Sequence, residues 1–126
     1  MQTSRDLLAS AYKHFNARDI DATLKTMHED VDWPNGMEGG SVHGHSAVRD
    51  YWTRQWKLFD PHVEPVSFTP DPTNPTGRTI VQVHQPVRDL DGKILLDHMV
   101  QHVYLVEHGL IRSMEIRDAD SDEAPS

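Results

Sequence analysis

The chain has 126 residues, no cysteine and a formal net charge of −8. A chain of this length is expected to form one domain with its own hydrophobic core. The absence of cysteine excludes disulfides and thiolate metal sites. The 12 Lys and Arg residues are scattered among 20 Asp and Glu residues. This disfavours nucleic acid as a partner, because phosphate binding needs a clustered basic face.

The first residues, MQTSRDLLASAYKHF, contain no apolar signal segment. No run approaches the roughly 18 apolar residues that are needed to cross a bilayer. We therefore expect a cytoplasmic protein without a membrane partner.

Helical periodicity marks the beginning of the chain. Apolar residues at helical spacing predict a helix over 4–17 behind a Ser4 cap. A short second helix is expected over 20–27, with Asp19 or Asp21 as its cap.

A third helix follows an irregular stretch. Residues 31–34 are expected to be extended, because the residue before a proline avoids the helical region. A glycine-containing loop over 35–44 leads to a helix that Ser46 caps and that Asp60 and the following proline end.

Alternating apolar and polar residues in the last third predict an antiparallel meander. Strands are expected over 63–69, 78–88, 93–107 and 110–118. Pro65 places the first of them at an edge or at a bulge. The class is therefore α+β: a cone-shaped, curved antiparallel sheet with three N-terminal helices on its concave face and a pocket between them. We expect a single domain over 1–118 and a flexible acidic tail over 119–126.

Four local motifs carry a resemblance to a known family: NARDID at 16–21, HEDVDW at 28–33, VHGHSAV at 42–48 and HVYLVEHGLI at 102–111. In this order and spacing they make the chain resemble the SnoaL-like branch of the nuclear transport factor 2-like superfamily. The resemblance implies a cystatin-like fold. It implies no single reaction, because this fold hosts isomerases, dehydratases, cyclases, epoxide hydrolases and binding domains.

The resemblance also argues against one activity. Ketosteroid isomerases of the superfamily use an Asp as general base, and a Tyr and a protonated Asp as oxyanion donors. Motif alignment puts Trp33, Ala11 and Gln101 at these positions. Tryptophan cannot abstract a proton and alanine cannot donate a hydrogen bond, so steroid isomerisation by that mechanism is not expected.

Strand alternation divides the meander residues between two faces. If the turn at 89–92 pairs Arg88 with Lys93, then His84 lies opposite Asp97, although a bulge would shift this register. The resemblance implies that Gln101 faces the pocket. The residues expected to contact a small, apolar ligand are Trp33, Gln82, Met99, Gln101, Val103 and Met114.

His84 and Asp97 are the expected catalytic residues. A carboxylate beside an imidazole raises its basicity and fixes its tautomer, which suits a general base. Gln101 would donate to a ligand carbonyl. The alternative is that the pair is a structural cross-strand ion pair.

We expect no metal and no cofactor. His43 and His45 share a loop but have no obvious third ligand. The chain contains no phosphate-binding glycine motif and no dinucleotide fingerprint.

The opposite sheet face is expected to be apolar and to carry Val81, Val83, His98, Val100, His102 and Tyr104. Such a face should be covered, so we expect a homodimer through this outer sheet face. The leading functional hypothesis is a cofactor-independent lyase, isomerase or cyclase that acts on a small apolar carbonyl compound by general acid–base chemistry. The alternative is a ligand-binding or dimeric assembly domain without chemistry.

Overall fold

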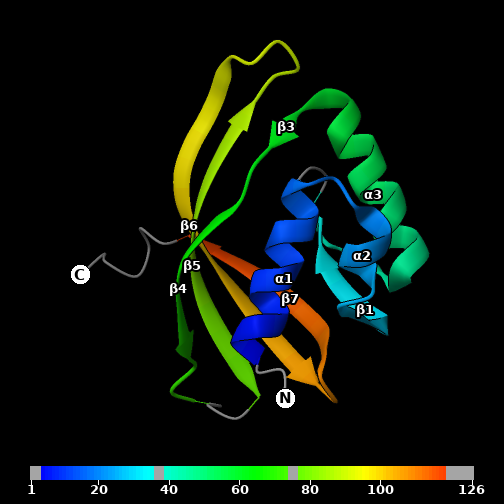
Figure 1. Cartoon of the computed structure of the whole chain (residues 1–126), viewed down its shortest axis with the longest axis vertical. Coiled ribbons are helices and arrows are strands. Elements are labelled where there is room, and N and C mark those ends of the chain that lie inside the picture. Colours follow the sequence, from blue (N-terminus) through cyan, green and yellow to red (C-terminus); the bar gives the residue numbers. More distant parts are fainter. Residues whose placement is uncertain (1–3, 36–38, 74–76, 119–126) are drawn as a thin grey trace.

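The computed structural model describes residues 4–35, 39–73 and 77–118 (Figure 1). Within these ranges the elements are α1 (Ser4–Asn16), α2 (Ile20–Leu24), β1 (Met27–Pro34), β2 (Ser41–His43), α3 (Gly44–Leu58), β3 (Asp60–Pro61), β4 (Glu64–Pro70), β5 (Arg78–Arg88), β6 (Ile94–Glu107) and β7 (Leu110–Asp118). The expected tail at 119–126 lies outside the described residues. No helix in the described ranges has the length and apolar character needed to cross a membrane.

The strands form one curled sheet in the order β2-β1-β7-β6-β5-β3, and β4 also pairs with β5. Figure 1 shows the three helices gathered on one side of this sheet, while the β5–β6 hairpin extends beyond them. This is the expected α+β arrangement. The sheet is not purely antiparallel, because β1 pairs with β7 in parallel.

The N-terminal helices form for the reasons that their sequences indicate. The buried face of α1 consists of Leu7, Leu8, Ala11 and Tyr12, at the spacing of an amphipathic helix. Asp19 caps α2, since its carboxylate accepts a hydrogen bond from the Ala22 amide at 3.1 Å. The prediction of this cap is confirmed.

The start of α3 differs from the prediction. The helix begins at Gly44, and its N-cap is His43, which makes no side-chain capping bond. Gly44 has a φ of +85°, a left-handed conformation that glycine adopts without a steric penalty. Strand β2 therefore turns directly into α3, and the expected Ser46 cap lies inside the helix.

The core lies between the helices and the inner face of the sheet. Its largest fully buried side chain is Trp52 of α3, which is 1% exposed. The Trp52 ring lies edge-on to Phe15 and Trp33, with centroids 5.4 and 5.6 Å away, and stacks on Trp56 at 5.9 Å. Aromatic packing of this kind fixes α3 against α1 and β1.

The register of β5 and β6 differs from the expected one by two residues. His84 pairs with Met99, and Asp97 pairs with Pro86. The cause is a wider turn, in which the Asp89 amide donates to the Lys93 carbonyl at 2.8 Å, followed by an irregularity between Val87 and Arg88. A shift of two residues keeps each side chain on its face, so His84 and Asp97 remain neighbours on a diagonal.

A bulge between Leu105 and Val106 changes the pairing of β6 with β7 by one residue. Met114 consequently lies opposite Tyr104 instead of Val103. A one-residue shift exchanges the two faces of a strand. Met114 therefore shares its face with the even-numbered residues of β6. The expectation that it shares a face with Gln101 is wrong.

Candidate functional site

A cavity of about 70 Å³ lies between the helices and the inner face of the sheet. Its walls include the rings of Phe15, Trp33, Tyr51 and Trp52. A water molecule needs at least about 10–15 Å³ and occupies about 30 Å³ in the liquid, so the cavity has room for about two waters before its walls move. The site is suited to a compact, flat and largely apolar molecule.

Three polar side chains form a hydrogen-bonded cluster on the wall of this cavity. The Tyr12 hydroxyl lies 2.7 Å from Nδ1 of His102, and the Tyr104 hydroxyl donates to the Tyr12 oxygen at 2.9 Å. Tyr12 comes from the buried face of α1, while His102 and Tyr104 alternate with outward residues on β6. When the imidazole carries its proton on Nε2, Tyr104 donates to Tyr12 and Tyr12 donates to Nδ1 of His102.

Burial keeps this cluster uncharged. Desolvation lowers the pKa of His102 to about 3, because no charged partner compensates for the loss of water. Burial likewise raises the pKa of Tyr12, with a further contribution from Tyr104. The pKa of Tyr104 is raised by burial. The cluster thus offers neutral hydrogen-bonding groups at physiological pH.

The expected ligand-contacting residues divide between the two faces. Trp33 and Met114 line the cavity. Strand alternation puts the other four on the opposite side of the sheet: Gln82, Met99, Gln101 and Val103. Val103 is buried there without belonging to the main core cluster, and Met99 is 38% exposed.

The apolar face that was expected to point outward is in fact the inner one. Val81 and Val83 are completely buried in the core, and His102 and Tyr104 are almost so. The helices of the same chain cover this face, which removes the reason for expecting a second copy to cover it.

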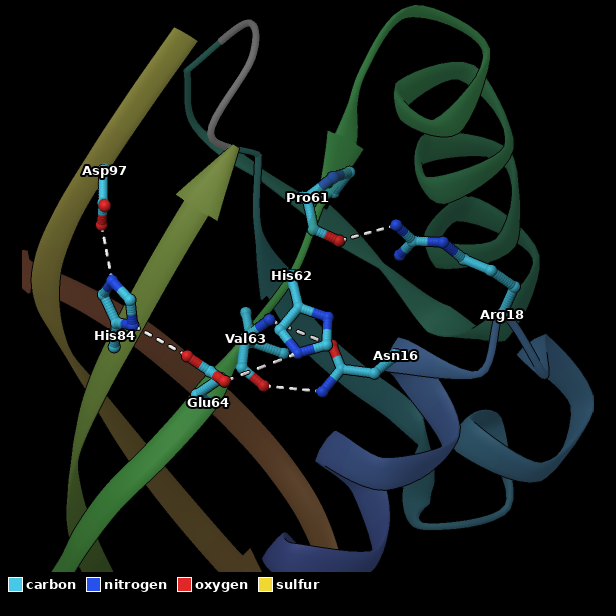
Figure 2. Close-up of polar contacts among 8 residues, drawn as sticks. All are labelled: Asn16, Arg18, Pro61, His62, Val63, Glu64, His84 and Asp97. Atoms are coloured by element: carbon cyan, nitrogen blue, oxygen red, sulfur yellow. Dashed lines mark hydrogen bonds and ion pairs between the residues drawn. The ribbon is translucent and has the colours of Figure 1, made fainter. Parts of the chain in front are cut away.

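His84 and Asp97 do contact each other, but outside the cavity. Figure 2 shows the His84 ring between two carboxylates: Nδ1 lies 2.8 Å from Glu64 and Nε2 lies 2.5 Å from Asp97. With a carboxylate on each ring nitrogen, both nitrogens act as donors and the imidazole is charged. The bonds to Glu64 and then to Asp97 raise the pKa of His84.

Together Glu64, His84 and Asp97 join β4, β5 and β6 through this charged imidazole. Its contribution to stability is present below the unfolded-state pKa of about 6.5 and is lost as the pH rises through the higher folded-state pKa. The geometry matches the alternative of a structural cross-strand ion pair.

Side chains at and just after the end of α1 bond to the backbone of residues 61–63 (Figure 2). The Asn16 amide donates to the Val63 carbonyl at 2.7 Å, and its oxygen accepts from the Val63 amide at 3.0 Å. Arg18 donates to the Pro61 carbonyl at 2.7 Å and pairs with Asp60. Val63 lines the cavity, so these bonds hold its wall in place.

His43 and His45, which were expected in a loop, lie at the end of β2 and in the first turn of α3, and they contact separate groups. His43 contacts Asp32 through Nδ1 at 2.7 Å, whereas Nε2 of His45 lies 3.0 Å from the Met27 carbonyl. Within the described ranges, no group of three or more His, Asp or Glu side chains has a geometry that could hold a metal ion.

The sequence prediction did not include Tyr12, His102 and Tyr104 among the ligand-contacting residues, although all three line the cavity. A signal for two of them was available. The resemblance placed Ala11 and Gln101 at the site. Tyr12 directly follows Ala11, and His102 directly follows Gln101. Gln101 itself lies on the face of β6 that points away from the cavity, whereas the next residue points towards it.

The SnoaL-like domain model matches residues 8–114. TerC, crystallised with polyporic acid, is 24% identical with a TM-score of 0.77, and the match covers 94% of each chain. An NTF2-like protein of unknown function from Burkholderia pseudomallei K96243 is 22% identical with a TM-score of 0.79, and 98% of this chain and 95% of that chain are covered. RV0760c from Mycobacterium tuberculosis, in complex with estradiol-17beta-hemisuccinate, is 19% identical with a TM-score of 0.77. The match covers 95% of this chain and 97% of that chain. Among curated proteins, none matches. At these identities the similar structures show the fold alone.

Proposed function

This chain belongs to the SnoaL-like domain family, and on that premise we propose that it binds a small, largely apolar ring compound bearing a carbonyl or hydroxyl group. The observation that carries the proposal is the Tyr12–His102–Tyr104 cluster on the wall of an aromatic cavity. Apolar walls with a few convergent polar groups are typical of small-molecule sites. TerC and RV0760c, which share the fold, were each crystallised with a small organic ligand.

The proposal is tested by filling the cavity. Ala11 lines it from α1, so Ala11→Leu introduces a larger side chain with little loss of helix propensity. We expect the affinity for acetophenone, a neutral single-ring ketone, to fall at least about tenfold, which corresponds to about 1.4 kcal/mol. Equilibrium dialysis measures the change.

The chain offers a matched control for this experiment. Ala9 lies on the same helix but is exposed, so Ala9→Leu is the same substitution away from the cavity. Its affinity for acetophenone should equal that of the wild type. Equal losses in both variants, or no loss in Ala11→Leu, would count against the cavity as the binding site.

Carbonyl chemistry is the second candidate function. Tyr12 and His102 form a hydrogen-bonded pair on the wall of the cavity, and a neutral imidazole can polarise a carbonyl oxygen by donating to it. A cofactor-independent isomerase, lyase or cyclase would use such polarisation. Its simplest sign would be faster exchange of the acetophenone methyl protons with deuterium oxide, followed by NMR. The second candidate fails if the wild type gives no more exchange than Tyr12→Phe. A catalytic role for His84 and Asp97 stays a prediction for a surface outside the cavity.

Pairing of two copies also stays a prediction. The outer face carries Met99, which is 38% exposed and lies opposite the charged His84. Apolar residues flanked by ion pairs can be buried against a second copy. Light scattering should give a mass of twice 14.4 kDa, and Met99→Asp should lower it. A monomer at high concentration would contradict the pairing.

A further inference from the structure

We propose that the cavity selects uncharged ligands and rejects the anionic forms of the same compounds. The inference deepens the proposed function and rests on it, because it names the charge state of the molecule that the site accepts. Neutral ketones, aldehydes and phenols would bind, whereas carboxylates, phenolates and enolates would stay in water.

The lining of the cavity is the first argument. No Lys, Arg, Asp or Glu is among the described residues that line it. An anion that entered would leave water without meeting a counter-charge, and such a transfer is unfavourable. The glutamines of the lining, Gln55 and Gln85, are polar but neutral.

The polar cluster is the second argument, because its donors are used within it. Tyr104 donates to Tyr12, and Tyr12 donates to Nδ1 of His102. The imidazole N–H at Nε2 is then the donor that remains for a ligand. This neutral donor satisfies a carbonyl or hydroxyl oxygen, and the amides of Gln55 and Gln85 that also line the cavity carry no charge to balance an anion.

The surroundings of His102 do not supply charge either. Across the sheet its partners are Val81 on β5 and Ile116 on β7, and Tyr12 faces it from α1.

Charged groups near the cavity have other partners. Arg18, just after the end of α1, pairs with Asp60 and lies over the Phe15 and Trp56 rings. The outer face carries two further pairs, His84 of β5 with Asp97 and Arg117 of β7 with Glu115.

The test uses two probes with the same ring. 4-Nitrophenol titrates near neutrality and changes colour when it ionises, whereas 4-nitroanisole has no ionisable group. Equilibrium dialysis gives the affinity of the protein for each probe from mildly acidic to mildly alkaline pH. The absorbance spectrum of the bound probe reports its charge state.

We expect the apparent Kd of 4-nitrophenol to rise about tenfold per pH unit above the probe's own pKa, because only the neutral form binds. The Kd of 4-nitroanisole should stay constant over the same range, and bound 4-nitrophenol should keep the spectrum of its neutral form. Bound probe with the spectrum of the anion would overturn the inference and leave the proposed function intact. If neither probe binds at any pH, the proposed function and the inference both fail.

A charge introduced at the edge of the cavity provides a second readout. Ile116 lines the cavity, is 44% exposed and lies opposite His102. Ile116→Lys should allow the anion of 4-nitrophenol to bind as well. The apparent Kd of 4-nitrophenol should then be nearly independent of pH. Ile116→Met, of similar length but uncharged, should keep the preference for the neutral form. The inference is contradicted if the lysine variant still binds only the neutral probe.

Discussion

Trp52→Ala is expected to lower the free energy of unfolding by about 3–5 kcal/mol, the cost of truncating a large aromatic side chain in a core. Trp52 is 1% exposed. Its ring contacts Phe15, Trp33 and Trp56, so its loss leaves a void that three aromatic neighbours cannot close without moving. Urea unfolding followed by circular dichroism measures the loss independently of tryptophan fluorescence.

Trp52 also lines the cavity, so the same substitution removes part of the ligand-binding wall. The control is Leu58→Ala on the same helix, because Leu58 is 57% exposed. A surface truncation of this kind should change the free energy of unfolding by no more than about 0.5 kcal/mol. Similar losses in the two variants would mean that α3 presents a different face to the sheet.

Acid is expected to destabilise the protein through His102. In the folded state burial lowers the pKa of His102 to about 3, whereas in the unfolded chain it is about 6.5. Between these values the unfolded state takes up a proton that the folded state does not. Stability is therefore lost as the pH falls from about 6.5 towards 3, by roughly 1.4 kcal/mol per pH unit. Above pH 7 this contribution is constant.

Urea unfolding at pH 7, 5 and 4 measures this slope in the wild type and in His102→Gln. Glutamine does not titrate, and its oxygen can still accept the Tyr12 hydroxyl proton. The carboxylates contribute to both proteins alike, so the difference in slope isolates His102. Parallel pH profiles would show that the imidazole is charged or exposed in the folded protein.

The sequence predicted the bounds of the meander strands closely because turn residues at 89–92 and 107–109 separate them. The longest was expected over 93–107 and runs from Ile94 to Glu107. The strand at 63–69 was expected to lie at an edge or carry a bulge, and β4 has a register shift between Pro65 and Ser67. Proline removes one donor of the ladder, so its effect can be read from sequence.

The sequence could not tell which face of the meander points inward. Strand β6 is apolar on both sides: Met99, Val103 and Leu105 lie on one face, and Val100 and Tyr104 on the other. Hydrophobic alternation therefore does not indicate which face of β6 points towards the core. The bulge between Leu105 and Val106 then made Met114 and Gln101 look like neighbours on one face, although the structure separates them.

The contact between His84 and Asp97 was predicted from the wrong register and still forms. A two-residue shift leaves both side chains on one face, and a diagonal pair is within reach of a long side chain. The sequence thus predicted the contact but not its position relative to the cavity, because that position depends on the packing of α1 and α3.

The most direct test of the binding site is a crystal structure of the protein soaked with acetophenone. We predict electron density for the ligand in the cavity, with its ring against Trp33 and its carbonyl oxygen within hydrogen-bond distance of the Tyr12–His102 cluster. Ligand density on the outer face beside His84 and Gln101, or an unoccupied cavity at saturating acetophenone, would contradict this assignment of the site.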